Sequence, residues 1–348
     1  MKVVIDISPL HVAHKHRGVG SYTRSLVEAL QKYDPENDYI LTSKSHQVEA
    51  DLIHYPYFDL FFLTLPYSKS KPTVVTIHDT IPLIYPKAYP PGLRGALKLR
   101  LQKLSLRSVK AIITDSDRSA KDIQKYLKQP AEKINRVYLA ADTHFHKIAH
   151  DQALTVLSKY NIQQPYLLYV GDINYNKNIP RLLKVFGQVK TNHQLVLVSR
   201  ALNQPIPQAA EIHRLIEELK LTQRVKIVTA IPIDPKTEMA ALYSETDWYI
   251  QPSLYEGFGL PVLESIACKS GTIVSTGGSL PEITPPGSIT FNPGEDRSMQ
   301  KAMEQAMALS QTEKQALLLK SQQFARQFTW ERTAQATIKV YRHALNSL

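Results

Sequence analysis

The sequence predicts an α/β protein with two doubly wound domains, each a parallel sheet covered by helices on both faces. Short apolar runs rich in β-branched residues alternate with helical segments, and this alternation occurs twice along the 348 residues. Runs that are apolar throughout are typical of parallel strands buried on both faces. A chain of this length is long for one domain and comfortable for two.

The first series of strands lies in the N-terminal half. Its apolar runs end in polar residues, and they are KVVIDI (2–7), DLIHYP (51–56), TVVTIHD (73–79) and AIITDS (111–116). A helix is predicted after the first run, because Tyr22, Leu26 and Leu30 recur at helical spacing. Together these segments predict one parallel sheet with helices between its strands.

The second series begins near residue 165. Its predicted strands are YLLYVGD (166–172), QLVLVS (194–199), RVKIVTA (224–230), WYIQPS (248–253) and TIVST (272–276). The polar segment 141–164 joins the two series, so we expect an N-terminal domain over 1–160 and a second domain over 161–329. Sheets of this kind bind ligands beyond the carboxyl ends of their strands, and the notable motifs lie at those ends.

Basic residues are concentrated in the N-terminal part of the chain. The formal net charge is +11, and residues 1–150 hold 22 Lys and Arg against 14 Asp and Glu, a net of +8. This imbalance predicts an anionic partner, either phosphate groups, an anionic membrane or nucleic acid. Nucleic acid is not expected, because the basic residues are not interleaved with stacking aromatics and no nucleic-acid motif is present.

The cysteine content and the length of the apolar runs limit the cellular compartments in which this protein is expected. The single cysteine, Cys268, excludes an internal disulfide framework and is predicted to be a small buried hydrophobe. The start, MKVVIDISPLH, reaches Asp6 too soon for a signal peptide. The run LFFLTLP (60–66) is far shorter than the roughly 20 residues that span a bilayer. The sequence therefore predicts a cytoplasmic protein, soluble or peripheral at the inner face of the membrane.

Two motifs of the N-terminal half follow predicted strands. In RGVGSYT, Gly18 and Gly20 would let the backbone approach a phosphate at a helix N-terminus, and the alternative is a plain turn. Thr23 stands where the dinucleotide fingerprint needs a third glycine, so a dehydrogenase is disfavoured. In TIHDTIP, His78 ends a buried strand, where it can serve a ligand or form a structural hydrogen bond.

A lysine follows the first strand of the second series. VGDINYNKNIPRLL (170–183) ends a strand and begins a helix, with Lys177 near the helix N-terminus and Asn178 as the predicted N-cap. The helix dipole disfavours a cation at this end. A lysine there makes more sense if an anionic ligand is shared between its ammonium group and the backbone amides. The alternative is a solvated surface lysine.

Two carboxylates flank a glycine-rich turn in YEGFGLPVLESIACKSG (255–271). Pro261 fits the first turn of a helix, which places Glu264 in the first or second turn and Glu256 in the loop before it. An acid in a first turn stabilises a helix by only about 0.3–1 kcal/mol, which explains neither the glycines nor Glu256. Carboxylates accept hydrogen bonds from hydroxyls, and the N–H groups of 257–260 can donate to a ligand. Hydroxyls together with phosphate indicate a nucleotide-sugar.

Two other catalytic arrangements are disfavoured. DSD (115–117) has the form of a metal-binding Asp-x-Asp, but it precedes the helical segment RSAKDIQKYL, so Ser116 or Asp117 is better explained as an N-cap. No other cluster has metal-ligand spacing. No G-x-S-x-G nucleophile motif is present. Neither a metal site nor a serine nucleophile is expected.

A basic amphipathic helix is predicted over 90–110. Its leucines recur on one face and its cations lie elsewhere: Leu93, Leu97, Leu101 and Leu104, and Arg94, Lys98, Lys103 and Arg107. Two interpretations stay open. Either the leucines pack on the core below a solvated basic face, or the helix contacts an anionic membrane or a lipid-phosphate acceptor. The segment YFDLFFLTLPY (57–67) would add an apolar contact if it is exposed.

Taken together, the motifs resemble those of the retaining GT-B glycosyltransferases of family 4 and look mannosyltransferase-like. EGFGLPVLE (256–264) matches the Glu-x7-Glu motif of that family. Six further segments resemble the family, and together they occur in family order over nearly the whole chain. They are RGVGSYTRSLVEAL, VVTIHDTIPLIYP, SDRSAKDI, VGDINYNKNIPRLL, GGSLPEI and FTWERTAQATIKVYRHAL. The resemblance implies the GT-B fold, two Rossmann-like domains facing across a cleft, with a C-terminal helix (330–348) packed back on the N-terminal domain.

The resemblance also implies roles for individual residues, three of them catalytic. Glu256 would hold hydroxyls of the donor sugar, Lys177 would bind the diphosphate and stabilise the leaving nucleotide, and His78 would lie by the anomeric carbon. Glu264 would bind the ribose hydroxyls. The remaining donor-binding groups would be the glycine loop, Gly18 and Gly20, and the backbone of Gly257, Phe258, Gly259 and Leu260. Family members generally need no metal or other cofactor, and retention is thought to proceed by same-face substitution without a protein nucleophile.

At one place the sequence departs from the family. Many relatives carry an arginine near the VG loop or just before the lysine, where this chain has Asp172 and Asn176. Arg200, at the end of the next strand, or Arg17 would have to serve as the second phosphate cation.

The resemblance implies a metal-independent hexosyltransferase. Its donor would be GDP-mannose or a UDP-hexose, with mannose favoured by HDTIP and GDINYNKN, and its acceptor a glycan or lipid-linked molecule. The alternative is a non-catalytic GT-B-like protein that binds nucleotide-sugar or acceptor beside an active transferase.

Overall fold

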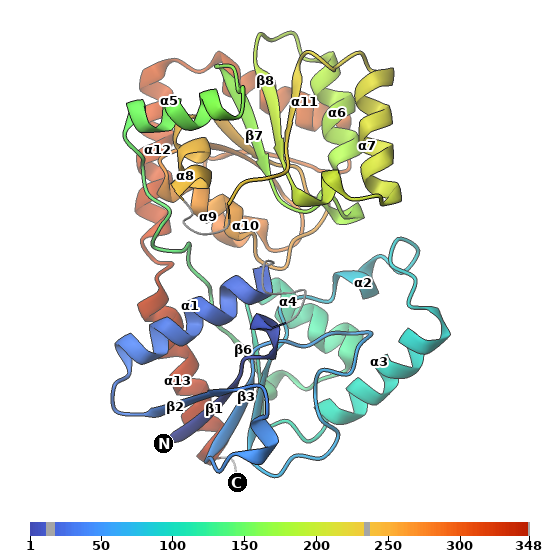
Figure 1. Ribbon diagram of the computed structural model, residues 1–348, viewed down its shortest axis with the longest axis vertical. Helices are drawn as coiled ribbons and strands as arrows, with labels where there is room; N and C mark the ends of the chain where they lie inside the picture. The colour runs from blue at the N-terminus through green and yellow to red at the C-terminus, as the bar shows by residue number, and fades with distance from the viewer. Residues whose placement is uncertain (12–17, 233–236, 347–348) are drawn as a thin grey trace. The chain divides into compact units, whose positions relative to one another are not determined.

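The chain folds into two compact units, each built on its own parallel sheet (Figure 1). The computed structural model describes residues 1–11, 18–232 and 237–346. Unit 1 comprises Met1–Ala140 and Phe328–Leu348, and unit 2 comprises Ala141–Gln327. The junction lies earlier than the boundary at residue 160 that the sequence predicts, because helix α5 (His150–Lys159) packs on α8 (Thr237–Glu245) of unit 2.

The sheet of unit 1 has six parallel strands in the order β2-β1-β3-β4-β5-β6. The strands are β1 (Lys2–Asp6), β2 (Asp38–Thr42), β3 (Leu52–Tyr55), β4 (Thr73–Thr76), β5 (Ala111–Thr114) and β6 (Ile134–Arg136). The register pairs Val4 with Ile53 and Val75 with Ile112. These four side chains belong to one buried apolar cluster, so they mark one face of the sheet.

Helices cover both faces of this sheet. They are α1 (Gly18–Tyr33), α2 (Ile81–Ile84), α3 (Gly92–Leu106), α4 (Asp117–Asp122) and α13 (Trp330–Asn346). Leu106 of α3 belongs to the apolar cluster on the face marked by Val4. The C-terminal helix α13 packs against α1 and contacts β4 and β5, as predicted (Figure 1). Its buried Tyr341 forms a 2.7 Å hydrogen bond with His54 of β3.

The sheet of unit 2 is also parallel, in the order β12-β11-β10-β7-β8-β9. The strands are β7 (Tyr166–Val170), β8 (Gln194–Val198), β9 (Val225–Val228), β10 (Trp248–Gln251), β11 (Gly271–Ser275) and β12 (Ile289–Phe291). The remaining helices are α6 (Ile179–Gln188), α7 (Pro207–Glu218), α9 (Leu260–Ala267), α10 (Leu280–Ile283), α11 (Asp296–Ala308) and α12 (Gln311–Ala325). The two units, each a parallel sheet with helices, confirm the predicted fold class of two doubly wound α/β domains.

Three strands, β2, β6 and β12, are missing from the prediction. Each lies at the edge of its sheet. No residue of β2 or β6 is buried, and Thr290 in β12 is exposed. An edge strand has a neighbour on one side only, so it need not carry the continuous apolar run by which the other strands were recognised.

Helix α3 turns a different face to the core than its leucine pattern suggests. Its buried residues are Gly95, Gln102, Ser105 and Leu106. The exposed fractions are 93%, 59%, 39% and 40%, respectively, for Leu93, Leu97, Leu101 and Leu104. The core-packing interpretation of these leucines is therefore wrong. Within 1–11, 18–232 and 237–346, no helix has the length and apolar character needed to cross a membrane.

Candidate active site

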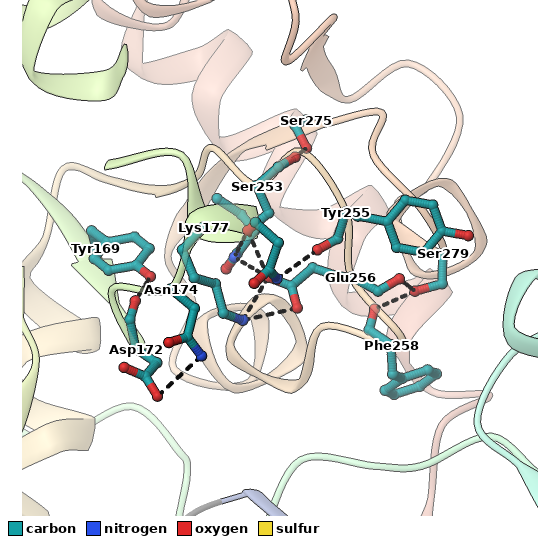
Figure 2. Close-up of polar contacts among 12 residues, drawn as sticks. Tyr169, Asp172, Asn174, Lys177, Ser253, Tyr255, Glu256, Phe258, Ser275 and Ser279 are labelled. Carbon is teal, nitrogen blue, oxygen red and sulfur yellow. Dashed lines mark hydrogen bonds and ion pairs between the residues drawn. The ribbon is translucent and has the colours of Figure 1, made fainter. Parts of the chain in front are cut away.

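Lys177 and Glu256 meet at the carboxyl edge of the unit 2 sheet (Figure 2). Lys177 ends the short helix η6 (Tyr175–Lys177) after β7, and Glu256 follows β10, the strand beside β7. Neighbouring parallel strands end at the same edge of a sheet, which brings these distant residues together. The lysine ammonium donates to both carboxylate oxygens, at 2.8 Å to Oε1 and 2.9 Å to Oε2. The site thus contains a bidentate ion pair, and Lys177 is not a solvated surface lysine.

Side chains of β10 and its extension orient Glu256. Tyr249, Gln251 and Ser253 alternate with residues of the opposite face, so they line one side of the strand. Gln251 Nε2 and Ser253 Oγ both donate to Glu256 Oε1, at 2.9 and 2.6 Å. The Tyr249 hydroxyl donates to Gln251 Oε1 and fixes its amide. Oε1 accepts three hydrogen bonds, whereas Oε2 accepts one from the described residues, which leaves Oε2 capacity for a ligand hydroxyl.

The backbone around Glu256 is held by side chains of two other loops (Figure 2). Ser279 Oγ donates to the carbonyl groups of Glu256 and Phe258, both at 3.0 Å. Asn176 Nδ2 donates to the Tyr255 carbonyl at 2.9 Å. Gly278 has φ +66°, and a Cβ there would lie 2.3 Å from the Glu256 carbonyl oxygen, so only glycine fits. These contacts make a rigid frame around the carboxylate.

Helix α6 begins directly after Lys177, as predicted, with Asn178 at the N-cap position. The Asn178 side chain does not cap the helix. It donates instead to the carbonyl groups of Pro252 and Pro293, both at 3.0 Å, from a left-handed backbone conformation. The positive end of α6 therefore lies next to Lys177 without a side-chain cap from Asn178.

Glu264 lies in α9, which has Pro261 in its first turn, as predicted. The Tyr243 hydroxyl donates to Glu264 Oε2 at 3.1 Å. Burial raises the pKa of Tyr243, and the Glu264 carboxylate raises it further, so the hydroxyl remains a donor. Burial, followed by Glu264, also raises the pKa of the Cys268 thiol to about 12. Cys268 is buried, as predicted. In the turn before α9, Gly257, Phe258 and Gly259 are buried, and Leu260 begins the helix.

Arg200 and Arg17 are the two predicted substitutes for the missing arginine. Arg200 begins the short helix η7 (Arg200–Asn203) at the carboxyl end of β8 and donates to the Ile231 carbonyl at 2.9 Å. Arg17 lies outside the described residues. At the family's arginine positions, Asn176 is buried on a backbone carbonyl, and Asp172 accepts a hydrogen bond from the Ile173 amide at 2.8 Å.

A second pair, His78 and Asp115, lies in unit 1. His78 follows β4 and Asp115 follows the adjacent strand β5, and His78 Nδ1 lies 2.7 Å from Asp115 Oδ2. The exposed fractions of the side chains are 17% and 4%. The sequence prediction missed Asp115, although its place at the end of the strand beside the His78 strand was a usable signal.

The three residues of the DSD motif therefore make three different contacts. Asp115 pairs with His78, Ser116 caps α4 by accepting from the Ser119 amide at 2.9 Å, and Asp117 pairs with Arg136 Nε at 2.9 Å. The predicted N-cap is confirmed at Ser116. Throughout the described residues, no group of three or more His, Cys, Asp or Glu could hold a metal ion.

The environment of His78 combines burial with negative charge. Burial has the largest influence and lowers the pKa of His78, but Asp115, Asp79 and the Pro56 carbonyl together raise the pKa above its ordinary value. Burial raises the pKa of Asp115, while His78 opposes this rise. Three buried atoms have no partner within hydrogen-bond geometry among the described residues, although the Pro56 carbonyl is near enough to His78 to raise its pKa. They are Nε2 of His78, Oγ1 of Thr80 and Oδ1 of Asp115. Buried polar atoms of a folded protein usually have partners, so this cluster marks a place for a polar ligand.

The N-terminal end of α1 lies on the side of His78. The Tyr22 ring packs edge-on against the His78 ring, with centroids 4.6 Å apart, and its hydroxyl lies 3.1 Å from Thr76 Oγ1. Tyr22 is about one turn beyond Gly18. Gly18 is exposed and Gly20 is buried in this first turn. The structure thus groups the glycine loop with His78 in unit 1, and Lys177 with Glu256 in unit 2.

Two family models match the chain in succession. The model described as Glycosyltransferase Family 4 matches residues 31–145, and the model described as Glycosyl transferases group 1 matches residues 157–318. The chain belongs to the family 4 glycosyltransferases, and it is an enzyme of the hexosyltransferase class.

Individual relatives agree with this assignment. O-antigen chain mannosyltransferase B of Escherichia coli is 28% identical over 77% of this chain and 70% of its own length. Serotype-specific mannosyltransferase WbdA of Escherichia coli is 27% identical over 79% of this chain, but the match spans only 34% of WbdA. Sucrose-phosphate synthase from Thermosynechococcus elongatus has the same fold, with a TM-score of 0.75 and 18% identity, over 100% of this chain and 99% of that one.

Proposed function

We propose that this chain transfers a hexose, with mannose favoured, from a nucleotide-diphosphate sugar to a glycan or lipid-linked acceptor, with retention of anomeric configuration. The observation that carries the proposal is the bidentate pair of Lys177 and Glu256 beside the N-terminus of α6. The relatives named mannosyltransferases support the sugar. Anabaena HepE, a structural neighbour with a TM-score of 0.75 and 17% identity, was solved with UDP and glucose, which supports a nucleotide-sugar donor.

The proposed donor site uses both members of the pair. A sugar hydroxyl would donate to Glu256 Oε2, which accepts only Lys177 among the described residues. The diphosphate would share the Lys177 ammonium with Glu256 and receive hydrogen bonds from the first turn of α6. Glu264 would bind the ribose hydroxyls, with Tyr243 fixing its second oxygen.

The proposed reaction exchanges one bond at the anomeric carbon for another. The bond to the donor phosphate oxygen breaks, the acceptor oxygen bonds on the same face, and the acceptor proton passes to the departing phosphate. Lys177 and the positive end of α6 would stabilise the charge of the leaving diphosphate, so a metal ion is not required in this scheme. Three donors hold the Glu256 carboxylate, which weakens it as a nucleophile and favours a path without a glycosyl-enzyme intermediate.

In unit 1, His78 is the residue proposed to touch substrate. Its Nε2 is buried without a partner among the described residues and suits a sugar hydroxyl. Asp115 fixes Nδ1, and therefore the ring orientation, as a positioning residue. The basic excess of residues 1–150 is consistent with a phosphorylated acceptor.

A thermal-unfolding panel with GDP, UDP, GDP-mannose and UDP-glucose tests the donor class. A ligand that binds only the folded state at 100 times its Kd stabilises that state by about 2.7 kcal/mol. We expect one nucleotide and its sugar conjugate to raise the unfolding temperature, and the other base to do so less. No shift with any of the four would contradict a nucleotide-sugar site.

Variants of the pair test the reaction. Lys177→Ala and Glu256→Ala should each lower transfer by at least about 100-fold while the chain still folds, because each removes a charge aimed at the donor. Lys184→Ala, on the exposed side of α6, is the matched control and should transfer normally. Full activity in both site variants would overturn the assignment.

The competing proposal is a non-catalytic binding protein that partners an active transferase. It is favoured by one observation, the buried Asn176 and the acidic Asp172 where relatives carry a phosphate-binding arginine. Slow hydrolysis of the bound donor separates the two proposals, because a transferase hydrolyses its donor without acceptor and a binding protein releases it intact.

A further inference from the structure

We propose that unit 1 carries a docking surface for an anionic lipid bilayer, formed by the exposed leucines of α3 and by a basic pocket that takes the phosphate of a lipid head group. Two separate features support this surface, one apolar and one cationic. Neither feature includes His78, Lys177 or Glu256, so the proposal stands independently of the transfer reaction.

The apolar feature is the face of α3 formed by Leu93, Leu97, Leu101 and Leu104, named here the leucine face. These residues are three or four positions apart, so they form one stripe. The core-facing positions 95, 99, 102 and 106 are displaced from the stripe by about two residues, or about 200° around the helix. The leucine face therefore points away from the core, which agrees with the exposed fractions of its side chains.

A loop beside α3 extends this apolar surface. Phe62, Leu63 and Tyr67 are exposed by 63%, 60% and 71%. Of the twelve large apolar side chains exposed in the described part of the chain, seven lie between residues 62 and 104. Such a concentration differs from the singly scattered apolar residues of an ordinary protein surface, and it marks an interaction site.

The loop and the helix form one fixed surface. Gln102 Nε2 donates to the Asp59 carbonyl at 3.0 Å, and Lys69 Nζ donates to the Ser105 carbonyl at 2.6 Å. The Lys98 ammonium lies 4.7 Å from the centroid of the Phe62 ring. The exposed rings of the loop are therefore held beside the cations of α3.

The charge of this surface selects its partner. Residues 80–114 contain seven Lys and Arg and no Asp or Glu. Asp59 is the acid of the loop, and its carboxylate is engaged by the Phe61 amide at 2.7 Å and the Tyr57 hydroxyl at 2.6 Å. Apolar side chains flanked by cations are typical of helices that lie in the interface of an anionic bilayer. A second copy of this chain would bring equal positive charges together and be repelled.

The cationic feature is a pocket of about 470 Å³ at the C-terminal end of α3, named here the basic pocket. Five cations and no acid line it, and the lining residues are Arg100, Lys103, Leu104, Arg107, Leu127, Lys128, Gln129, Pro130 and Lys133. Burial lowers the pKa of Lys103, and the nearby charge of Lys128 lowers it further. A phosphate between these groups would relieve their repulsion. Leu104 belongs to both features, so the basic pocket and the leucine face are continuous.

The basic pocket lies at the opposite edge of the sheet from the His78/Asp115 pair. Arg107 precedes β5 and Lys133 precedes β6, so the pocket is at the amino ends of these strands. His78 and Asp115 follow the carboxyl ends of β4 and β5. A phosphate in the basic pocket is therefore remote from that pair, and its role is attachment rather than reaction.

Vesicle flotation of the full chain tests the proposal. We expect the chain to float with vesicles of phosphatidylcholine and phosphatidylglycerol at low salt, to be released by high salt, and to stay unbound with phosphatidylcholine alone. Lys103→Gln with Lys128→Gln should weaken binding about 25-fold, since each cation near an anionic surface contributes about fivefold. Leu97→Gln with Leu101→Gln should weaken it by at least about tenfold. The matched controls are Lys301→Gln with Lys320→Gln, and Leu319→Gln, exposed residues of unit 2 that should leave binding unchanged.

Four results would overturn the proposal, three from vesicle and ligand binding and one from light scattering. One is a chain that does not float with anionic vesicles at low salt, and another is equal flotation of the wild type and both double variants. The third is stabilisation by inorganic phosphate that equals stabilisation by soluble short-chain phosphatidylglycerol, which would make the basic pocket a free-phosphate site. Light scattering is run in parallel, because a dimer that the leucine variants abolish would assign the leucine face to a second copy instead. Unchanged thermal unfolding and donor binding of the variants show that folding is not the cause.

Discussion

The two charged pairs of this protein differ in how completely their polar atoms are used. In unit 2, Glu256 is bound by Lys177, Gln251 and Ser253, and its backbone is held by Ser279. In unit 1, His78 and Asp115 bind each other through one contact and leave Nε2 and Oδ1 buried without partners among the described residues. Each carboxylate oxygen of the first pair has a partner among the described residues, and we call this pair saturated. The second pair leaves two buried atoms without such a partner, and we call it unsaturated.

The difference indicates two ways of preparing a site. A saturated pair is held in place before a ligand arrives, so its ligand finds fixed charges and fixed geometry. An unsaturated pair carries a desolvation cost of about 1–3 kcal/mol for each buried group without a partner, and a ligand that supplies hydrogen bonds removes that cost. Under the proposed function, the pair in unit 2 sets orientation, whereas the pair in unit 1 gains its partners from the substrate.

Within unit 1, two buried histidines show what the carboxylate contributes. Both ring nitrogens of His54 have partners, Tyr341 at 2.7 Å and Thr76 at 2.8 Å, and no carboxylate is among them. Burial, followed by the charge of His78, lowers the pKa of His54 to about 3. The His78 side chain is 17% exposed and so less buried than His54, and Asp115 raises its pKa. Burial without a carboxylate partner keeps His54 neutral, whereas Asp115 favours the charged form of His78.

The largest expected effect comes from breaking the saturated pair. Lys177→Met leaves the Glu256 carboxylate buried with two neutral donors, and it should lower the free energy of unfolding by about 2–3 kcal/mol. This value is below that of a fully buried pair, because the Lys177 side chain is 20% exposed. Adding Glu256→Gln should recover part of the loss, since no charge is then left alone. Urea unfolding of the two single variants and the double variant measures the coupling.

Lys184→Met serves as the control for this cycle, because Lys184 is exposed on the same helix α6. If the stability losses of the two single variants add up to that of the double variant, the pair is not energetically coupled. That result would contradict the coupling expected from its bidentate geometry. Transfer should stay at least about 100-fold below wild type in all three variants, including the one with recovered stability.

A comparable effect on stability is expected from distorting the frame around Glu256. Gly278→Ala would place a methyl group 2.3 Å from the Glu256 carbonyl oxygen and 2.6 Å from its nitrogen, so the backbone must shift. The free energy of unfolding should fall by about 2–3 kcal/mol. Gly287→Ala is the matched control, because Gly287 also has a positive φ, +84°, but has open space around its Cβ position. That control should cost about 1 kcal/mol, the strain of φ alone.

Donor binding separates the two glycine variants further. Gly278→Ala should also reduce the thermal shift caused by the nucleotide-sugar, since the displaced carbonyl belongs to a donor-binding residue of the proposed site. Gly287→Ala should keep the full shift. Equal losses of stability in the two variants would indicate that the frame tolerates a methyl group at position 278.

Much of this fold could be predicted because its central strands are buried on both faces. Nine apolar runs predicted nine strands, from β1 (Lys2–Asp6) to β11 (Gly271–Ser275). The edge strands β2, β6 and β12 were not predicted, since partial exposure removes the continuous apolar run, whereas the edge strand β9 was predicted. The exposed leucines of α3 could not be assigned from spacing alone, because a stripe has the same period whether it faces the core or a partner. The structure shows which face of α3 is buried, because Gly95 and Gln102 are buried and Gln102 donates to the Asp59 carbonyl.

The candidate site was predictable only in part, for a related reason. Lys177 and Glu256 were chosen for their motifs, but their direct contact depends on β7 and β10 being neighbours in the sheet. Strand order cannot be obtained from strand positions in one sequence. No motif predicted Gln251 and Ser253 as partners of Glu256, or Asp115 of the DSD motif as the partner of His78. Their hydrogen bonds in the structure show these roles.

The smallest expected effect comes from Asp115→Asn, which converts the unsaturated pair into a neutral one. In the folded wild type the pKa of His78 is raised, so its ion pair contributes stability below about pH 6.5 that is lost as the pH rises through the raised value. The variant should lose about 1 kcal/mol of stability at pH 6 and much less at high pH. His54 acts oppositely, since its pKa near 3 makes stability fall as the pH drops below about 6.5.

In Asp115→Asn, the loss of stability that His54 causes below about pH 6.5 should therefore remain. Only the loss of stability as the pH rises through the His78 pKa should become smaller. Titration of the His78 ring by NMR provides the direct measurement. Its pKa should fall, because among the described residues burial is then opposed only by Asp79 and the Pro56 carbonyl. The other titratable neighbours in that part of the chain are the buried Tyr22 ring and neutral His54. An unchanged pKa of His78 would mean that Asp115 does not control its protonation. The pair would then be a structural hydrogen bond, and the contrast between the two units would lose its electrostatic basis.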